Sequence, residues 1–490
     1  MHSEKKILIA GGGPGGMVAG IYALKAGLPA IIYEKNPVSG GECTGWNRNG
    51  YHIDGCIHWL VGTKEGRAMN RIWEETGALD GVEIYQPESF TAVLDGKTDL
   101  HIWRDPDRLK KHLLEVSPQD KAEIEELTDS VKAFRTFEPP VDKPADMMNI
   151  FEKLKFLFKN RKVIGRISKY SRITVREYKK RFASKLISTA FDQIVPETYS
   201  AYSLFFTLAA FADNNAGIPS GGSRAFAQRL EDKFVSLGGQ IRFNNAVEDI
   251  IIEDGIATGL RLSDGSVETG DFIVTACDPA VVFNKLLKGN FVDKEFQKRY
   301  ENPKAYPLQS CVYASFSVDA DLSSLPGNCL FAVDGIEFEG RKIEKLSAKH
   351  FCHEPSFSPA GKSLMVVYLD ADYDWWKSLY SDDELYRKEK SRLAKDIAGQ
   401  LELRFPELAG KTEPIDMATP VTYERYCGAY RGSWLAFGNT PQSEPLRHNG
   451  KVDGIDRLYM TGQWFMPPGG LPAAAITGKW TIRRIMKDIL

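Results

Sequence analysis

The sequence predicts an α/β protein in which a Rossmann-type domain carries a second, discontinuous α+β domain. The first 34 residues have the pattern of a strand, a glycine-rich turn, a helix and a second strand. Segments of similar character return at about 220–285 and at the C-terminal end. At 490 residues the chain is too long for a single hydrophobic core, so two or three domains are expected.

The N-terminal pattern indicates one βαβ unit. Residues 5–10 form a short apolar strand that runs into the glycine-rich turn at 11–16, and residues 17–26 have the apolar spacing of a helix. Residues 30–34 then form a second strand. Such a unit is expected to be right-handed, with its two strands parallel.

Two later segments complete this domain. A helix at 223–237 precedes several short strands, and the Asp-Gly pairs at 254–255 and 264–265 are hairpin signals between them. Near the end of the chain, a strand at 457–460 and a Gly/Pro-rich segment lead to a closing helix from about Pro472 to Ile489. We therefore assign residues 1–70, 220–285 and 455–490 to one domain. Residues 71–219 and 286–454 form the second, with strands such as 310–318 and 363–369.

Composition excludes several functional classes. Hydrophobic residues make up 43% of the chain, charged residues 26%, and the net charge is −2, which gives no overall attraction for nucleic acid. The seven cysteines are scattered without a CxxC pair, so neither a disulfide framework nor a zinc site is expected. His350, Cys352 and His353 lack a second ligand pair, and no metal is assigned. No apolar run approaches about 20 residues, and a cytoplasmic protein is expected.

Residues 151–185 are strongly basic, with thirteen Lys or Arg against Glu152 and Glu177. Phe151, Leu154 and Phe158 are among the apolar residues interleaved with these charges, as in a helix resting on an anionic membrane surface. A solvated basic helical face with its apolar side packed inward is the alternative. The sequence is compatible with both interpretations.

The glycine-rich turn matches a dinucleotide-binding fingerprint. Gly11, Gly13 and Gly16 would permit the tight turn, the approach of the backbone to a pyrophosphate, and close helix–strand packing. Glu34 follows 21 residues after Gly13, at the end of the second strand, where its carboxylate can accept hydrogen bonds from ribose hydroxyls. Taken alone, the fingerprint does not distinguish FAD from NAD.

Further motifs carry a family resemblance. They are Gly40-Gly41, the segments 50–54 and 57–62, the segment Tyr459-Met460-Thr461-Gly462-Gln463, and the segment 469–475. Together they resemble the large flavoprotein group that includes amine oxidases, phytoene desaturases, carotenoid isomerases and retinol saturases, and are most similar to the carotenoid and retinol branch. The resemblance covers about two fifths of the chain. It implies a Rossmann-type FAD-binding domain with a substrate-binding domain inserted into it.

The resemblance implies non-covalently bound FAD, because no cysteine matches the one that tethers flavin in some amine oxidases. In this group Arg usually follows the double glycine, whereas this chain has Glu42. Val247 matches a position whose backbone receives the adenine, although valine in a buried strand is first of all a core residue. The expected cofactor-binding residues are Gly11, Gly13, Pro14, Gly15, Gly16, Glu34, Lys35, Gly41, Glu42, Thr44, Val247, Gly462, Gly470, Leu471 and Pro472.

His58 is the candidate catalytic residue, since an imidazole can exchange a proton near neutral pH. A structural histidine is the alternative. Trp464 and Phe465 could line the substrate side of the flavin, but aromatic residues near a cofactor are as often packing.

The implied activity is dehydrogenation, saturation or isomerisation of carbon–carbon double bonds in a hydrophobic isoprenoid or polyene, by hydride exchange with flavin N5. The direction, the electron partner and the oligomeric state are not determined by the sequence. One alternative is an amine or amino-acid oxidase with a smaller, aromatic-walled pocket. Another is a non-catalytic prenyl-lipid carrier similar to the GDP-dissociation inhibitors of Rab GTPases.

Overall fold

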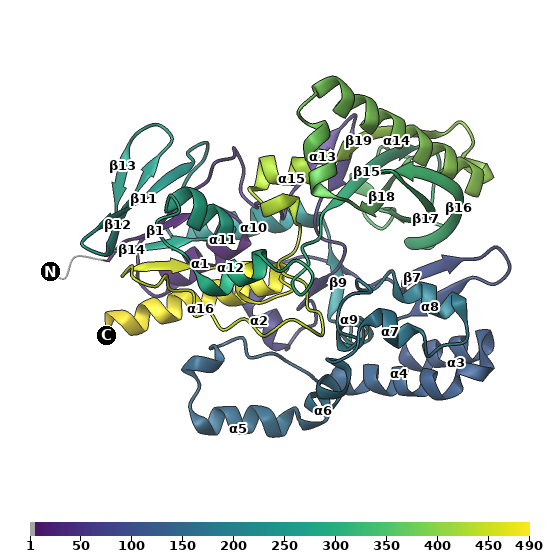
Figure 1. Cartoon of the computed structure of the whole chain (residues 1–490), viewed down its shortest axis with the longest axis horizontal. Helices are drawn as coiled ribbons and strands as arrows, with labels where there is room; N and C mark the ends of the chain where they lie inside the picture. The colour runs from purple at the N-terminus through teal and green to yellow at the C-terminus, as the bar shows by residue number, and fades with distance from the viewer. Residues whose placement is uncertain (1–4) are drawn as a thin grey trace.

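The computed structural model describes residues 5–490. Three groups of elements are visible in Figure 1: a parallel sheet with its helices near both termini, a large antiparallel sheet at upper right, and a layer of helices below that sheet. Segments from distant parts of the sequence lie side by side in the first group. The yellow C-terminal helix, for example, lies beside the purple N-terminal elements.

A five-stranded parallel sheet forms the centre of the first group, in the order β10-β2-β1-β14-β20. The strands are β1 (Ile7–Ala10), β2 (Ala30–Tyr33), β10 (Gln240–Arg242), β14 (Phe272–Thr275) and β20 (Leu458–Met460). The parallel pairing of Ile7 with Ala30 confirms the βαβ unit expected from the sequence. Strands from all three sequence segments therefore share one sheet.

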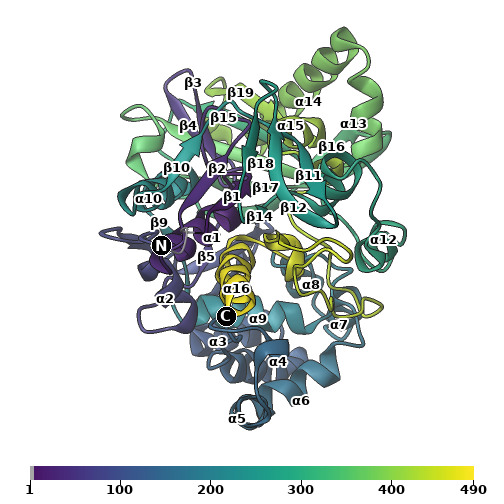
Figure 2. The ribbon, with the colours of Figure 1, turned by 90° about the vertical axis from the view of Figure 1, so that its left-hand side faces the viewer.

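Alternate residues of these strands face opposite layers, as the two-residue period of a strand requires. Ile7, Ile9 and Ile32 pack against three helices, α1 (Pro14–Lys25), α10 (Gly222–Ser236) and α16 (Leu471–Ile489). Leu8, Tyr33 and Ile273 pack on the opposite side. Figure 2 shows α16 and the strands β11 and β12 on different sides of the sheet.

An antiparallel meander covers that second side, formed by β11 (Val247–Glu253), β12 (Ile256–Leu262) and β13 (Val267–Thr269). Asp254 (φ 50°) and Gly255 (φ 79°) form the tight turn between β11 and β12, as the Asp-Gly pair predicted. Phe296 of α12 (Lys294–Tyr300) and Phe437 pack in the same layer. Parts of 286–454 thus contact the parallel sheet, and the domain boundary stays a prediction.

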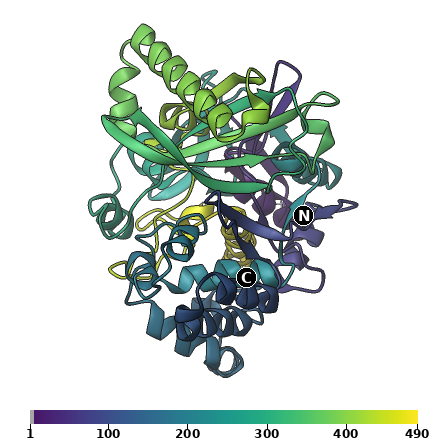
Figure 3. The ribbon, with the colours of Figure 1, turned by 90° about the vertical axis from the view of Figure 1, so that its right-hand side faces the viewer.

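The second sheet has seven strands in the order β19-β15-β18-β17-β16-β7-β8, antiparallel except where β16 pairs with β7. Its strands are β7 (Ser89–Leu94), β8 (Leu100–Trp103), β15 (Cys311–Val318), β16 (Asn328–Phe338), β17 (Arg341–His350), β18 (Ser363–Asp370) and β19 (Thr412–Ala418). Trp376 of α13 (Tyr373–Leu379) and Ile397 of α14 (Asp383–Arg404) pack on one face. Figure 3 shows these green helices above the sheet and the blue helical layer below it.

The helical layer holds most of residues 106–212. Its helices are α3 (Pro106–Val116), α4 (Lys121–Phe134), α5 (Ile150–Lys159), α6 (Arg161–Tyr170), α7 (Val175–Lys179), α8 (Lys185–Phe191) and α9 (Tyr202–Ala212). The basic segment is therefore several short helices, and no residue of α5 is buried. Tyr170, Tyr178 and Phe205 pack edge to face in the core of this layer.

Short elements join the three groups. They are the hairpin β3 (Gly45–Arg48) and β4 (Tyr51–Asp54), the small sheet of β5 (Leu60–Val61), β9 (Ala216–Pro219) and β6 (Ile84–Tyr85), and the helices α2 (Ala68–Glu75), α11 (Pro279–Val281) and α15 (Pro420–Cys427). No helix among residues 5–490 is both long enough and apolar enough to span a bilayer.

Candidate functional site

A single cavity of about 1590 Å³ begins at the carboxyl edge of the parallel sheet. It is lined there by Gly11, Glu34, Cys277 and Gly462, which follow β1, β2, β14 and β20. Ligands of open α/β sheets bind outside the carboxyl ends of the strands. The cavity continues between the seven-stranded sheet and the helical layer, so both parts of the molecule line it.

The N-terminus of α1 opens into this cavity. Its cap residue, Gly13, has no side-chain capping bond, and a Cβ added there would meet nothing closer than Gly40 O at 3.9 Å. Gly16 differs, because an added Cβ would lie 2.1 Å from Gly11 O and therefore inside the strand–helix packing. Free backbone amides at a helix N-terminus suit a phosphate group.

Glu34 lies at the end of β2 and is 5% exposed. Its Oε2 accepts the Gly12 amide at 2.8 Å, and its Oε1 accepts the backbone amide and the Nδ2 of Asn36, each at 2.9 Å. None of the ion pairs among the described residues includes Glu34. Its carboxylate faces the cavity with acceptor capacity remaining, which fits ribose hydroxyls.

A second helix N-terminus faces the same cavity. Gly462 (φ 124°), Gly469 (φ 100°) and Gly470 (φ 86°) have backbone conformations that favour glycine, and α16 begins directly afterwards. The Gly470 amide donates to Gln463 Oε1 at 2.9 Å. The positive end of a 19-residue helix is therefore directed at the cavity, where it would stabilise negative charge.

The structure brings most of the predicted cofactor residues together. The cavity is lined by Gly11, Gly13, Pro14, Gly15, Glu34, Lys35, Gly41, Glu42, Val247, Gly462, Gly470, Leu471 and Pro472, together with His58. Gly16 and Thr44 do not line it. The side chain of Lys35 extends to Arg425, whose backbone oxygen accepts from its Nζ at 3.1 Å.

Where the cavity passes from one sheet to the other, His58 lies beside a buried lysine. Burial, followed by the charge of Lys349, lowers the pKa of His58 to about 3, so its imidazole is neutral at pH 7. Its ring lies edge-on to Tyr313 and Tyr368, with centroids at 6.1 and 5.7 Å. With a pKa this low the imidazole does not take up a proton near pH 7, so His58 is a poor proton acceptor as well as a poor proton donor there.

Lys349 was not anticipated from the sequence. It lies on β17, is 6% exposed, lines the cavity and donates from Nζ to His58 O at 3.2 Å. Burial lowers its pKa to about 8. A lysine in a strand ordinarily faces solvent. The only sequence signal for an inward orientation is that Lys349 directly follows Leu346-Ser347-Ala348, a stretch of apolar and small residues. Lys349 is therefore a group on the second sheet that can exchange a proton near neutral pH.

The remainder of the cavity, called the apolar arm below, lies between the second sheet and the helical layer, and charged residues such as Arg67, Arg135 and Asp213 line it beside the apolar ones. Its walls include Trp59, Phe90, Phe134, Phe137, Ile167, Ile194, Phe206 and Phe211. Single small-molecule pockets usually measure about 300–1,000 Å³. The combined volume thus accommodates a dinucleotide together with an extended apolar molecule. Among residues 5–490, no group of three or more His, Cys, Asp or Glu is arranged to hold a metal ion.

The chain belongs to the flavin containing amine oxidoreductase family, whose family model matches residues 14–486. It is an FAD-dependent oxidoreductase, and the two helix N-termini, the glycine cradle and Glu34 fit that cofactor.

Among characterised relatives, the prolycopene isomerase of Daucus carota is 23% identical, with 99% of this chain and 80% of that protein covered. The 4,4'-diapophytoene desaturase of a Methylomonas species is 22% identical, with coverages of 96% and 93%. The all-trans-retinol 13,14-reductase of Macaca fascicularis is 22% identical, with coverages of 93% and 82%.

Solved structures show the same fold. An oxidoreductase from Methanosarcina mazei has a TM-score of 0.61 at 17% identity, covering 98% of this chain and 100% of its own. Putrescine oxidase bound to putrescine has a TM-score of 0.60 at 11% identity, covering 99% of each chain. The RAB GDI of Plasmodium falciparum has a TM-score of 0.50 at 12% identity, covering 93% and 92%.

We expect Gly13→Val to abolish FAD retention without unfolding the protein. The valine side chain would begin in open cavity space, because its Cβ would meet no protein atom closer than Gly40 O at 3.9 Å, and it would occupy the position of the pyrophosphate. Flavin absorbance of the purified variant measures retention, and thermal unfolding of both apoproteins measures stability. Gly16→Ala is the control: its Cβ collides with Gly11 O, so it should lower the melting temperature. Full flavin occupancy in Gly13→Val would contradict this assignment.

Proposed function

We propose that the protein catalyses desaturation, saturation or isomerisation of carbon–carbon bonds in a hydrophobic isoprenoid or polyene. The observation that carries the proposal is the continuity of one cavity from the FAD cradle into the apolar arm. A short polar substrate would not need such an arm. The named relatives act on polyenes or on retinol in three different ways, and this supports the substrate class while leaving the direction open.

In this proposal the residues at the carboxyl edge of the parallel sheet hold the cofactor. The backbone amides of Gly13 and Gly15 take the pyrophosphate, Glu34 takes the ribose hydroxyls, and backbone at Val247 lies against the adenine. The segment 469–472 holds the flavin end, where the α16 N-terminus favours negative charge. Bound FAD supplies two-electron hydride chemistry at carbon.

The protein itself manages the proton and excludes water. Lys349 is the proposed proton-transfer group because its amine lines the cavity and its pKa of about 8 allows both protonation states near neutral pH. Tyr313 and Tyr368 fix the neighbouring His58 ring. The apolar arm holds the substrate away from water. The shape of the arm sets the orientation of the substrate.

The geometry disfavours both alternatives. An amine or amino-acid oxidase would use a compact pocket, whereas the arm here continues the cavity between the second sheet and the helical layer. A non-catalytic prenyl-lipid carrier would need no flavin, so the open space at Gly13 and the Glu34 carboxylate that faces the cavity weigh against that alternative.

The direct test of the activity is anaerobic mixing of the FAD-loaded protein with candidate substrates. Oxidised flavin should bleach with a saturated or partly desaturated isoprenoid if the enzyme desaturates. Chemically reduced flavin should be reoxidised by a polyene if it saturates. Isomerisation would appear as a changed double-bond geometry in the recovered polyene, by chromatography. Rapid flavin reduction by small amines, with no reaction of polyenes in either redox state, would contradict the proposal.

Lys349→Met should slow the reaction by about 10²–10⁴-fold while FAD is retained. If the wild-type lysine removes a substrate proton, the rate should rise as pH increases through about 8, because only the neutral amine accepts a proton. If it donates a proton, the rate should fall over the same range. Lys349→Arg is the control, since its guanidinium keeps the charge but does not titrate in this range. An unchanged rate and pH profile in Lys349→Met would exclude the assigned role.

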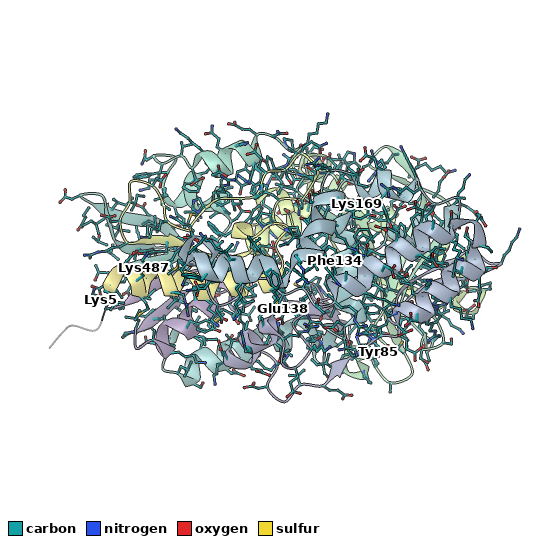
Figure 4. All side chains as sticks on the ribbon, turned by 90° about the horizontal axis from the view of Figure 1, so that it is seen from below. Lys5, Tyr85, Phe134, Glu138, Lys169 and Lys487 are labelled. Atoms are coloured by element: carbon teal, nitrogen blue, oxygen red, sulfur yellow. The ribbon has the colours of Figure 1, made fainter. Side chains whose placement is uncertain are left out.

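We also propose that α5 rests on an anionic membrane surface. Phe151 and Phe158 are 79% and 71% exposed, and Lys153, Lys155 and Lys159 lie on the same helix. Phe137 and Glu138, which line the cavity, contact this helix: the Phe137 and Phe156 rings are 6.4 Å apart, and Lys159 pairs with Glu138 at 3.6 Å. Figure 4 views this side from below and labels Glu138 and Phe134. Such docking would present the apolar arm to a bilayer.

The double variant Phe151→Ser, Phe158→Ser should bind vesicles containing phosphatidylserine at least about tenfold more weakly, because each fully buried Phe contributes about 1.5–3 kcal/mol. Wild-type binding should weaken with salt, since each surface Lys or Arg contributes about 1 kcal/mol that screening reduces. Leu403→Ser, at a 66% exposed position on α14, is the matched control and should leave binding unchanged. Vesicle sedimentation measures binding, and equal binding to neutral vesicles would contradict the proposal.

A further inference from the structure

Glu42 lies between the two helix N-termini that face the cavity. Its neighbour Gly41 lies against the α1 cap, where an added Cβ would be 3.5 Å from Gly13 Cα. Its own Oε2 accepts from Gln463 Nε2 at 2.9 Å, and the Oε1 of Gln463 accepts the Gly470 amide at the start of α16. Gln463 therefore links the Glu42 carboxyl to the second helix N-terminus. The other oxygen, Oε1, has no hydrogen bond to the described residues.

The charges around Glu42 disfavour its ionised form. None of the ion pairs among residues 5–490 includes it, although Lys35 and Lys285 also line the cavity. The ionisable groups that interact with it are Asp278 and the thiols of Cys56, Cys311 and Cys427. None of these can carry positive charge. Burial, then the nearby Asp278, raises the pKa of Glu42 to about 8, so most of it is protonated at pH 7.

The cofactor should strengthen this preference. By themselves the two helix N-termini would favour a carboxylate. A bound pyrophosphate places two negative charges at the α1 terminus, which offset that dipole and repel a further anion nearby. The protonated acid, in contrast, has an O–H donor that it can direct into the cavity.

We propose that Glu42 enters the FAD complex as a neutral carboxylic acid, with Gln463 holding Oε2 and the opposite O–H donating a hydrogen bond to the cofactor. This inference rests on the proposed FAD site. It also assigns a role to the glutamate that stands where the family resemblance leads one to expect arginine. A cation would attract the phosphates directly, whereas a neutral acid binds them only while it keeps its proton.

The consequence is a defined pH dependence of FAD affinity. Below the pKa that Glu42 has in the FAD-free protein, its carboxyl group is already protonated. In that range Glu42 should cause no change of FAD affinity with pH. Above about pH 8 the free protein must take up a proton to bind FAD, so affinity should fall by up to tenfold per pH unit. Glu42→Gln keeps a neutral donor of similar shape and should remove this fall. Asp278→Asn should keep the fall but move it to lower pH.

The test is titration of the apoprotein with FAD from about pH 6 to about pH 9.5, following flavin fluorescence for the wild type and both variants. The proposal predicts a falling wild-type affinity and a flat Glu42→Gln profile. Identical profiles for wild type and Glu42→Gln would overturn it, as would a Glu42→Gln variant that binds FAD as poorly at pH 7 as the wild type does at high pH. Wild-type protein that binds no FAD at any pH would instead refute the proposed function.

A second measurement uses the FAD-loaded protein and does not depend on refolding an apoprotein. The infrared difference spectrum between wild type and Glu42→Gln should contain the C=O stretch of a protonated carboxylic acid in the wild type at pH 7. A pair of carboxylate bands in its place would show that Glu42 is ionised in the complex and would overturn the proposal.

Discussion

The close contact between α1 and α16 is the constraint on which the site depends. A Cβ at Gly15 would lie 3.0 Å from Gly462 Cα, and one at Gly478 would lie 2.8 Å from Gly15 O. Glycine at these positions lets the two helices meet backbone to backbone above the parallel sheet. Because of this contact, both helix N-termini open into the same cavity. One positive end is thus available for a pyrophosphate and the other for the redox end of the same cofactor.

The buried residue Asp54 joins the second sheet to this arrangement through its carboxylate and its backbone oxygen. Asp54, at the end of β4, accepts from the Ser223 amide of α10 at 2.7 Å and from the Cys56 amide at 3.0 Å, while Tyr313 Oη of β15 donates to its backbone oxygen at 2.8 Å. These bonds hold the segment bearing His58 against β15 and β17. Lys349, on β17 of the second sheet, consequently lines the same cavity that begins at the edge of the parallel sheet.

Local sequence patterns predicted the turns and the strand ends, because these depend on neighbouring residues. They did not predict contacts that depend on tertiary packing. The glycine turn, Glu34 and the Asp254-Gly255 hairpin each have a local physical cause, and all were confirmed in position. The start of α1 was misplaced: the structure begins it at Pro14, because proline is favoured in the first turn, whereas apolar spacing pointed to Met17. The bonds from Lys349 to His58 and from Gln463 to Glu42 each join residues that are distant in sequence, so no local pattern could reveal them. The exposure of Phe151 likewise follows from how α5 packs, since an amphipathic pattern looks the same on a core or a surface.

We propose that one cavity holds the cofactor along the carboxyl edge of the parallel sheet and leaves the apolar arm for the substrate. The measurement that tests it most directly is a crystal structure of the FAD-loaded protein. Our account predicts density for the pyrophosphate at Gly13, for the ribose at Glu34 and for the flavin ring at Gly470, with the arm lined by Phe90 and Phe206 left open. Flavin density inside the apolar arm, or a pyrophosphate away from the α1 N-terminus, would contradict it.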